Sequence, residues 1–183
     1  SIDSLPDYYK NAVIAVEDHR FEKHGAIDFI AIGRAIVRNV SNFKLLEGGS
    51  TITQQVANNL YFIDTDTPAL IRKVAEIFVA FDLEKNYSKD EILELYLNLI
   101  FLGDTVYGVE KGSNYYFSKS AKDLDLAECA FLAGINHSPN SYNPFDNNNE
   151  EVMDNIKKRT KVVLNKMKEL GKIKTEEEYL QAV

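Results

Sequence analysis

The chain of 183 residues is long enough to bury a sizeable core, and its length fits one domain. Hydrophobic residues make up 45% of it, with only nine glycines and four prolines, which is typical of an ordered, helix-rich globular protein and argues against a chain disordered throughout. A net charge of −7 argues against a nucleic-acid partner, because proteins that bind phosphate backbones usually carry a basic surface.

The single cysteine and the short apolar runs exclude several kinds of site and segment. Cys129 lies in an apolar stretch, so we expect it in the core, and one cysteine excludes an internal disulfide and a multi-cysteine zinc site. No run approaches the roughly 20 apolar residues that span a bilayer, and the first residues lack a signal-peptide pattern. Because the first motif follows so soon after Ser1, we expect the chain to be a piece of a longer protein.

Helical spacing dominates from the N-terminus onward. An opening helix with Pro6 in its first turn directs its apolar side chains to the core and ends near Phe21, so Glu17 and Asp18 lie toward its C-terminal end. Asp28 is the expected N-cap of a second helix.

Two glycines, Gly48 and Gly49, then interrupt the pattern before a third helix with Ile52, Val56 and Leu60 at helical spacing.

Two capping boxes predict helix starts in the second half. Ser88 with Glu91 and Asp125 with Glu128 have the spacing in which each side chain bonds the other residue's backbone N–H. After an Asn-rich loop at 136–151, a long last helix is closed by Gly171. Since strand-like alternation is absent apart from short ambiguous runs, the predicted fold class is mostly α.

The helix predicted over 70–85 is apolar on two sides. One stripe holds Leu70, Val74 and Phe78, and an opposite wedge carries Arg72 and Glu76, so we expect the helix to be mostly buried. Burying charges is costly unless they are paired or functional. Arg72 and Glu76 therefore predict either a structural ion pair or a carboxylate that faces a cleft.

Glu17 and Asp18 are adjacent acids at a helix end, and their side chains point about 100° apart. One can face a substrate while the other bonds the backbone or Arg20, although by itself the run is more typical of a solvated charged surface. We expect His19 and His24 to be surface or hydrogen-bonding residues, because no His or Cys spacing resembles a metal site.

The segment EGGSTITQQ combines two glycines with hydroxyls and amides at a predicted helix start. Its backbone amides can hold phosphate or sugar oxygens at the positive helix end, together with the side chains of Ser50, Thr51, Gln54 and Gln55. The alternative is an N-cap with polar neighbours. The segment lacks the Gly-Lys-Ser/Thr ending of a P-loop and is not a nucleophile elbow.

Five segments in this order resemble the peptidoglycan glycosyltransferase family, which comprises monofunctional cell-wall enzymes and a domain of bifunctional class A penicillin-binding proteins. They are EDHRF (17–21), GGSTITQQ (48–55), RKVAEIFVAFDLEK (72–85), KDEILELYLN (89–98) and YGVEKGSNYYF (107–117). The resemblance extends over nearly the whole chain. It implies a single domain at 1–183 with a lysozyme-like fold, in which a large lobe and a small mobile jaw lobe border a long cleft.

The resemblance also implies a reaction. An acceptor sugar hydroxyl attacks the anomeric carbon of the growing glycan, inverts it and releases polyprenyl pyrophosphate. Glu17 corresponds to the general base and Glu76 to a second catalytic carboxylate. The implied substrate-binding residues are Arg34, Ser50, Thr51, Gln54, Gln55, Asn59, Arg72 and Lys73. No tightly bound cofactor is implied, but Mg²⁺ or another divalent cation can assist the release of pyrophosphate.

The implied partners are lipid II, the growing lipid-linked strand, the membrane surface and other cell-wall synthesis proteins. The implied location is the extracytoplasmic face of a bacterial cytoplasmic membrane, where Phe43, Leu45 and Leu46 are expected to enter the lipid.

Two departures from the family pattern leave alternatives open. Asn58 stands where many members have lysine, and the loop IDTDTPAL is acidic where many have arginine, so two expected phosphate ligands are missing. The alternatives are a catalytically weak module that holds lipid II and a lysozyme-like, glycan-cleaving enzyme that uses the paired carboxylates.

Overall fold

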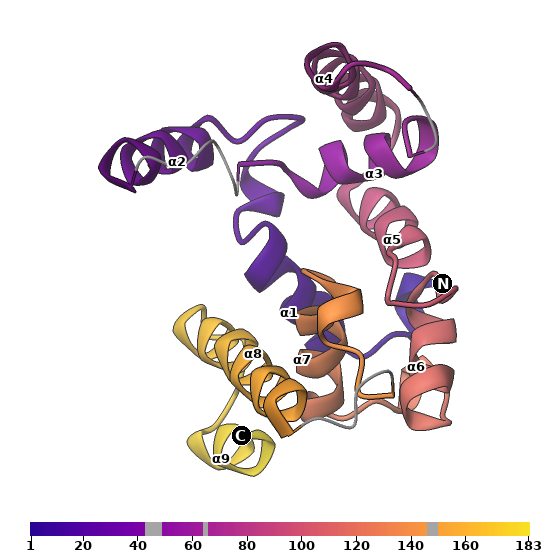
Figure 1. Ribbon diagram of the computed structural model, residues 1–183, viewed down its shortest axis with the longest axis vertical. Coiled ribbons are helices and arrows are strands. Elements are labelled where there is room, and N and C mark those ends of the chain that lie inside the picture. The colour runs from indigo at the N-terminus through magenta and orange to yellow at the C-terminus, as the bar shows by residue number, and fades with distance from the viewer. Residues whose placement is uncertain (43–48, 64–65, 146–149) are drawn as a thin grey trace. The chain divides into compact units, whose positions relative to one another are not determined.

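The computed structural model describes residues 1–42, 49–63, 66–145 and 150–183 (Figure 1). Within these ranges the chain is mostly helical, and the only β pairing described there is an isolated bridge between Phe101 and Tyr107. The expectation of a mostly α fold is therefore confirmed. Backbone contacts divide the chain into two compact units, a first unit of residues 1–19 and 97–183 and a second unit of residues 20–96.

The first unit is built around α7 (Leu126–Ile135), which packs against α1 (Asp7–Glu17), α6 (Val109–Phe117), α8 (Glu150–Glu169) and α9 (Glu176–Ala182). Most residues of α7 are buried, including Cys129, as expected from its apolar sequence. Opposite it, α1 buries Tyr9, Ala12 and Val13. This packing fixes the C-terminal end of α1, where Glu17 is the last helical residue.

The second unit contains α2 (Phe29–Asn42), α3 (Ile52–Tyr61), α4 (Ala69–Asn86) and most of α5 (Lys89–Leu99). Figure 1 shows α3 and α4 as neighbours, and their backbones make the main helix contact of this unit. The packing buries Ile52 and Val56 of α3 and Ala80 and Leu83 of α4. Because α3 and α4 pack against each other, polar residues of these two helices also lie close together.

The predicted helix starts at Asp28, Ser88 and Asp125 are confirmed. Asp28 Oδ1 accepts hydrogen bonds from the backbone N–H groups of Ile30 and Ala31 at 2.9 and 3.0 Å. Ser88 and Glu91 bond each other's backbone N–H, and Asp125 and Glu128 form the same reciprocal box. These starts were predictable because a cap depends on side chains within three residues of the helix.

The prediction that α4 is mostly buried was wrong. Its wedge with Glu76 and Leu83 is buried, but Leu70 is 78% exposed and Phe78 is 72% exposed. An apolar stripe is covered only where another element packs on it, and α3 covers one side of α4.

Helix boundaries and two helices also differ from the predictions. Pro6 is the N-cap of α1, and the helix ends at Glu17, before Phe21. The helices α6 and α9 were not predicted. A cap by Thr175 and Glu178 begins α9. Gly171, with a φ of 67°, follows the end of α8 as expected.

Candidate active site

Glu17 is held at the end of α1 in the first unit. Asp18, with φ −157° and ψ 73°, leaves the helical conformation and ends the helix. The Glu17 side chain is half-buried, and its Oε1 accepts a hydrogen bond from Nδ2 of Asn136 at 3.3 Å. The neighbouring Asp18 is buried. Of the two adjacent acids, Glu17 thus presents the more accessible carboxylate, as a residue that takes a proton from a substrate would require.

Arg20 pairs with Asp28, whereas the sequence suggested the backbone or Arg20 as the partner of one of the two adjacent acids. Its Nε donates to Oδ2 of Asp28 at 2.9 Å. Burial alone would raise the pKa of Asp28, but the hydrogen bonds from Ala31, Arg20 and Ile30 outweigh it and lower that pKa. Asp28 therefore remains ionised and ties the start of α2 to the segment after α1.

Thr51 and Gln54 form a capping box at the start of α3. Thr51 Oγ1 accepts from the Gln54 backbone N–H at 3.1 Å, and Gln54 Oε1 accepts from the Thr51 backbone N–H at 3.0 Å. Thr51 Oγ1 also donates to the carbonyl of Ala26 at 2.9 Å. Both side chains are buried and already bonded within the protein. Their predicted contact with substrate stays a prediction.

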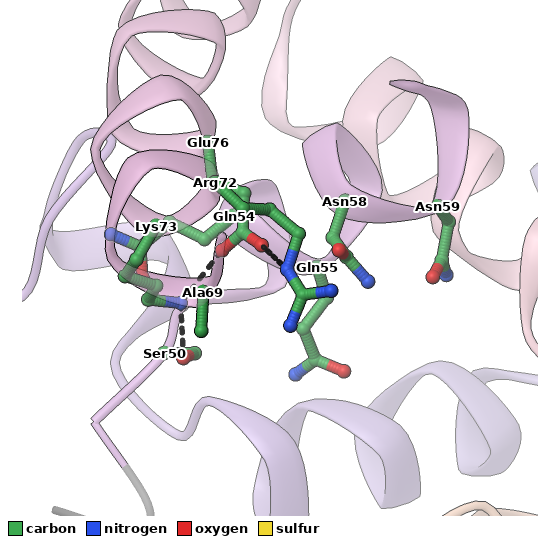
Figure 2. Close-up of a pocket in the computed structure, with 9 residues that line it drawn as sticks. All are labelled: Ser50, Gln54, Gln55, Asn58, Asn59, Ala69, Arg72, Lys73 and Glu76. Carbon is green, nitrogen blue, oxygen red and sulfur yellow. Dashed lines mark hydrogen bonds and ion pairs between the residues drawn. The ribbon is translucent and has the colours of Figure 1, made fainter. Parts of the chain in front are cut away.

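A polar pocket of about 420 Å³ opens between α3 and α4 within the second unit (Figure 2). Its lining residues are Ser50, Gln54, Gln55, Asn58, Asn59, Ala69, Arg72, Lys73 and Glu76. All of the predicted site residues of the second unit line it except Arg34 and Thr51. Arg34 lies on α2, and its side chain is exposed.

Glu76 is only 5% exposed, and cations of α4 neutralise it. Lys73 Nζ lies 2.9 Å from Glu76 Oε2, and Arg72 Nε lies 3.8 Å from Oε1. Lys73 Nζ also donates to Ser50 Oγ at 2.9 Å. The two alternatives from the sequence are therefore both present, since Glu76 is an ion-paired residue that also lines a pocket. The two paired cations offset most of the free-energy cost of burying the Glu76 carboxylate.

Carboxamides make up the rest of the polar lining. Gln55 Oε1 accepts from the Tyr96 hydroxyl at 3.3 Å, whereas the half-buried side chains of Asn58 and Asn59 have no hydrogen-bond partner among the residues that the structure describes. In the sequence, Asn58 stands out only as a missing cation. Its position four residues after Gln54 is the signal that could have placed it on the pocket face of α3.

Comparisons with known proteins agree with the resemblance. Residues 1–168 match the family model described as Transglycosylase. Penicillin-binding protein 1F of Bacillus subtilis is 41% identical over 177 residues, covering 97% of this chain and 24% of that protein. Penicillin-binding protein 1A of Neisseria gonorrhoeae is 44% identical over 168 residues, covering 92% of this chain and 20% of that protein.

Among solved structures, the crystal structure of penicillin-binding protein 1A from Haemophilus influenzae is 32% identical, with a TM-score of 0.46. The match covers 70% of this chain and 15% of that one. The chain spans about a quarter or less of the length of the curated relatives.

Proposed function

Because the chain belongs to the transglycosylase family, we propose that it is a peptidoglycan glycosyltransferase that joins lipid-linked disaccharide units of lipid II into glycan strands. The observation that carries the proposal is the pocket in which Arg72, Lys73 and the start of α3 surround the buried Glu76. Cations and amides beside a helix N-terminus fit the diphosphate of such a substrate.

In the proposed reaction, the acceptor hydroxyl oxygen attacks the anomeric carbon of the growing strand. The new carbon–oxygen bond forms on the face of the carbon opposite the diphosphate. The bond between that carbon and the diphosphate breaks, and the diphosphate leaves with the bonding electron pair, so the configuration inverts. Glu17 takes the hydroxyl proton, a contribution typically worth ~10²–10⁴ in rate. Its partial exposure and its hydrogen bond from Asn136 support this role.

The leaving group needs positive charge more than it needs an acid, because a diphosphate is already a weak base. Arg72 and Lys73 supply cations at the pocket, and Glu76 holds both in place. Arg34, on the exposed surface of α2, is proposed to contact acceptor phosphates.

A divalent cation fits this pocket as a partner of the substrate. The pocket offers one carboxylate, Glu76, and Mg²⁺ is commonly held by one or two carboxylates together with substrate phosphates. When bound, the cation would neutralise diphosphate charge. No tightly held cofactor is proposed.

The test is polymerisation of lipid II by the full-length protein, followed by gel analysis of the glycan products with and without divalent cation. We expect Glu17→Gln to abolish chain growth with no change in circular dichroism. Glu177→Gln on the exposed side of α9 is the matched control and should behave as wild type. Full activity of the Glu17→Gln protein would remove Glu17 from the role of base.

A module that only holds lipid II is the second candidate, and Asn58 in place of a pocket cation is the observation that favours it. The same gel distinguishes the two, because a binding module would retain lipid II in a pull-down without extending it. The family match does not favour the glycan-cleaving alternative.

We also propose that the protein acts at the membrane surface, on the extracytoplasmic face of a bacterial cytoplasmic membrane, alongside other cell-wall synthesis proteins. No described helix is long and apolar enough to span a bilayer. The exposed stripe of α4, formed by Leu70, Val74, Phe78 and Phe81, supports a surface contact. Phe43, Leu45 and Leu46, which were expected to enter lipid, lie outside the described residues.

A further inference from the structure

The pocket between α3 and α4 has two chemically different ends. Figure 2 shows Ser50 and Lys73 on one side, Asn58 and Asn59 on the other, and the Arg72 guanidinium between them. The side with Ser50 and Lys73 lies at the N-terminus of α3, which begins at Ile52. Asn58 comes more than one helical turn later. The attraction of a helix N-terminus for anions falls off within the first turn, so only one end of the pocket favours a negative charge.

The pocket is also weakly charged for a ligand that is wholly anionic. Its lining contains two cations, Arg72 and Lys73, and Glu76 pairs with both of them. Nothing else in the described lining carries a positive charge. This balance suits a ligand whose anionic part occupies one end and whose remainder is neutral.

The chemistry of Asn58 agrees with this division. A carboxamide offers two N–H donors and a carbonyl acceptor, and the side chain of Asn58 uses none of them on the residues that the structure describes. A phosphate can satisfy the donors but not the carbonyl, since an ionised phosphate has no hydrogen to give. A sugar hydroxyl or acetamido group both donates and accepts, and can satisfy both halves of the carboxamide.

We propose that Asn58 is a specificity-determining residue that hydrogen-bonds the sugar of the glycosyl diphosphate, while the end with Ser50 and Lys73 holds the diphosphate. The inference rests on the proposed function and deepens it. Asn59 lies on the same side of the pocket as Asn58, and Gln55 adds a further neutral carboxamide to the lining (Figure 2).

The test compares two ligands that differ only in the sugar, the polyprenyl diphosphate with its disaccharide and the same polyprenyl diphosphate without it. Binding is measured in detergent micelles with the full-length protein, in a Glu17→Gln background that prevents turnover. We expect Asn58→Ala to weaken binding of the sugar-bearing ligand about fivefold, the loss of one neutral hydrogen bond, and to change the sugar-free ligand less than about twofold.

Two controls separate this contact from a general disturbance of the pocket. Lys73→Ala should weaken the binding of both ligands, because it removes a cation from the end of the pocket that is proposed to hold the diphosphate. Asn155→Ala, on the exposed surface of α8, should change neither. Alanine is a better helix former than asparagine, so Asn58→Ala should leave α3 folded, which circular dichroism checks.

Equal losses for the two ligands, or no loss for either, would overturn the assignment of Asn58 to the sugar. If the Glu17→Gln parent binds both ligands while this comparison fails, the proposed function stands without the inference. If the parent binds neither ligand, the proposed function fails, and the inference fails with it.

Discussion

At the scale of single residues, Glu17, Asp28 and Glu76 are acids that the chain holds by three different means. Asn136 donates one hydrogen bond to the half-buried Glu17. Asp28 receives two backbone N–H groups and the Arg20 guanidinium. Glu76 is neutralised by lysine and arginine of its own helix. Of these three acids, the half-buried Glu17 is the one proposed to accept a proton, a task that needs a site still open to substrate.

Asp28 should make the stability of the second unit dependent on pH. Its folded pKa lies below the ordinary value of 3.8, so its stabilisation is complete above that value and is lost as the pH falls through the folded pKa. We expect Asp28→Asn to lower the free energy of unfolding by about 2 kcal/mol at pH 7, because Arg20 loses its buried partner. Urea denaturation at pH 7, 5 and 3 measures this difference.

The difference between the wild type and Asp28→Asn should shrink only below about pH 4. A difference that is the same at pH 7 and pH 3 would mean that the carboxylate charge contributes nothing. The exposed Asp154, which pairs with Lys158 on α8, provides a control, since Asp154→Asn should cost little at any pH.

At the scale of elements, the start of α3 depends on one hydroxyl. Thr51→Ala removes the acceptor for the Gln54 backbone N–H and the donor to the carbonyl of Ala26, and it does so at a buried position. We expect a loss of about 1–2 kcal/mol in the free energy of unfolding, measured by urea denaturation. Thr51→Ser should retain most of the stability.

Thr175 at the start of α9 forms the same capping box on the surface. Thr175→Ala should cost clearly less than Thr51→Ala, because water can replace the lost bond at an exposed cap. Equal costs at the two caps would show that the buried bond to Ala26 adds no stability.

Local signals account for the parts of the fold that the sequence predicts well. The caps at Asp28, Ser88 and Asp125 need only side chains and backbone within one turn, and all three helices begin as expected. In contrast, α6 contains Gly112 and Ser113 and lacks a clear apolar stripe, so it was missed. For α9, which was not predicted either, the spacing of Thr175 and Glu178 is itself the signal of a helix start.

The pocket shows where sequence reasoning stops. The sequence predicts that the 50–55 segment can hold phosphate or sugar oxygens and that the 72–76 segment carries an ion pair or a carboxylate that faces a cleft. The structure places both segments around one pocket. Their meeting depends on the packing of α3 on α4, which neither segment encodes alone. Which side of α4 is covered is decided by the same packing, and this is why the exposure of Leu70 and Phe78 was not foreseen. The single domain at 1–183 and the mobility of its jaw lobe stay predictions.

At the scale of the whole molecule, the net charge and the apolar stripe of α4 make opposite contributions to membrane binding. A chain with a net charge of −7 is repelled by anionic lipid, whereas exposed Leu70, Val74 and Phe78 favour insertion into the interface. Salt screens the repulsion, with a Debye length of about 30 Å at 0.01 M and about 8 Å at 0.15 M, but leaves the apolar contribution.

We therefore expect binding to vesicles rich in phosphatidylglycerol to strengthen between 0.01 and 0.15 M salt, which is opposite to the behaviour of a basic peripheral protein. Co-sedimentation of this 183-residue chain with vesicles measures it. Replacing Leu70, Val74 and Phe78 by serine should reduce binding to both anionic and zwitterionic vesicles, whereas Val162→Ser on the exposed side of α8 should not. If binding weakens with salt, or if the triple replacement leaves it unchanged, the membrane contact does not depend on this face of α4.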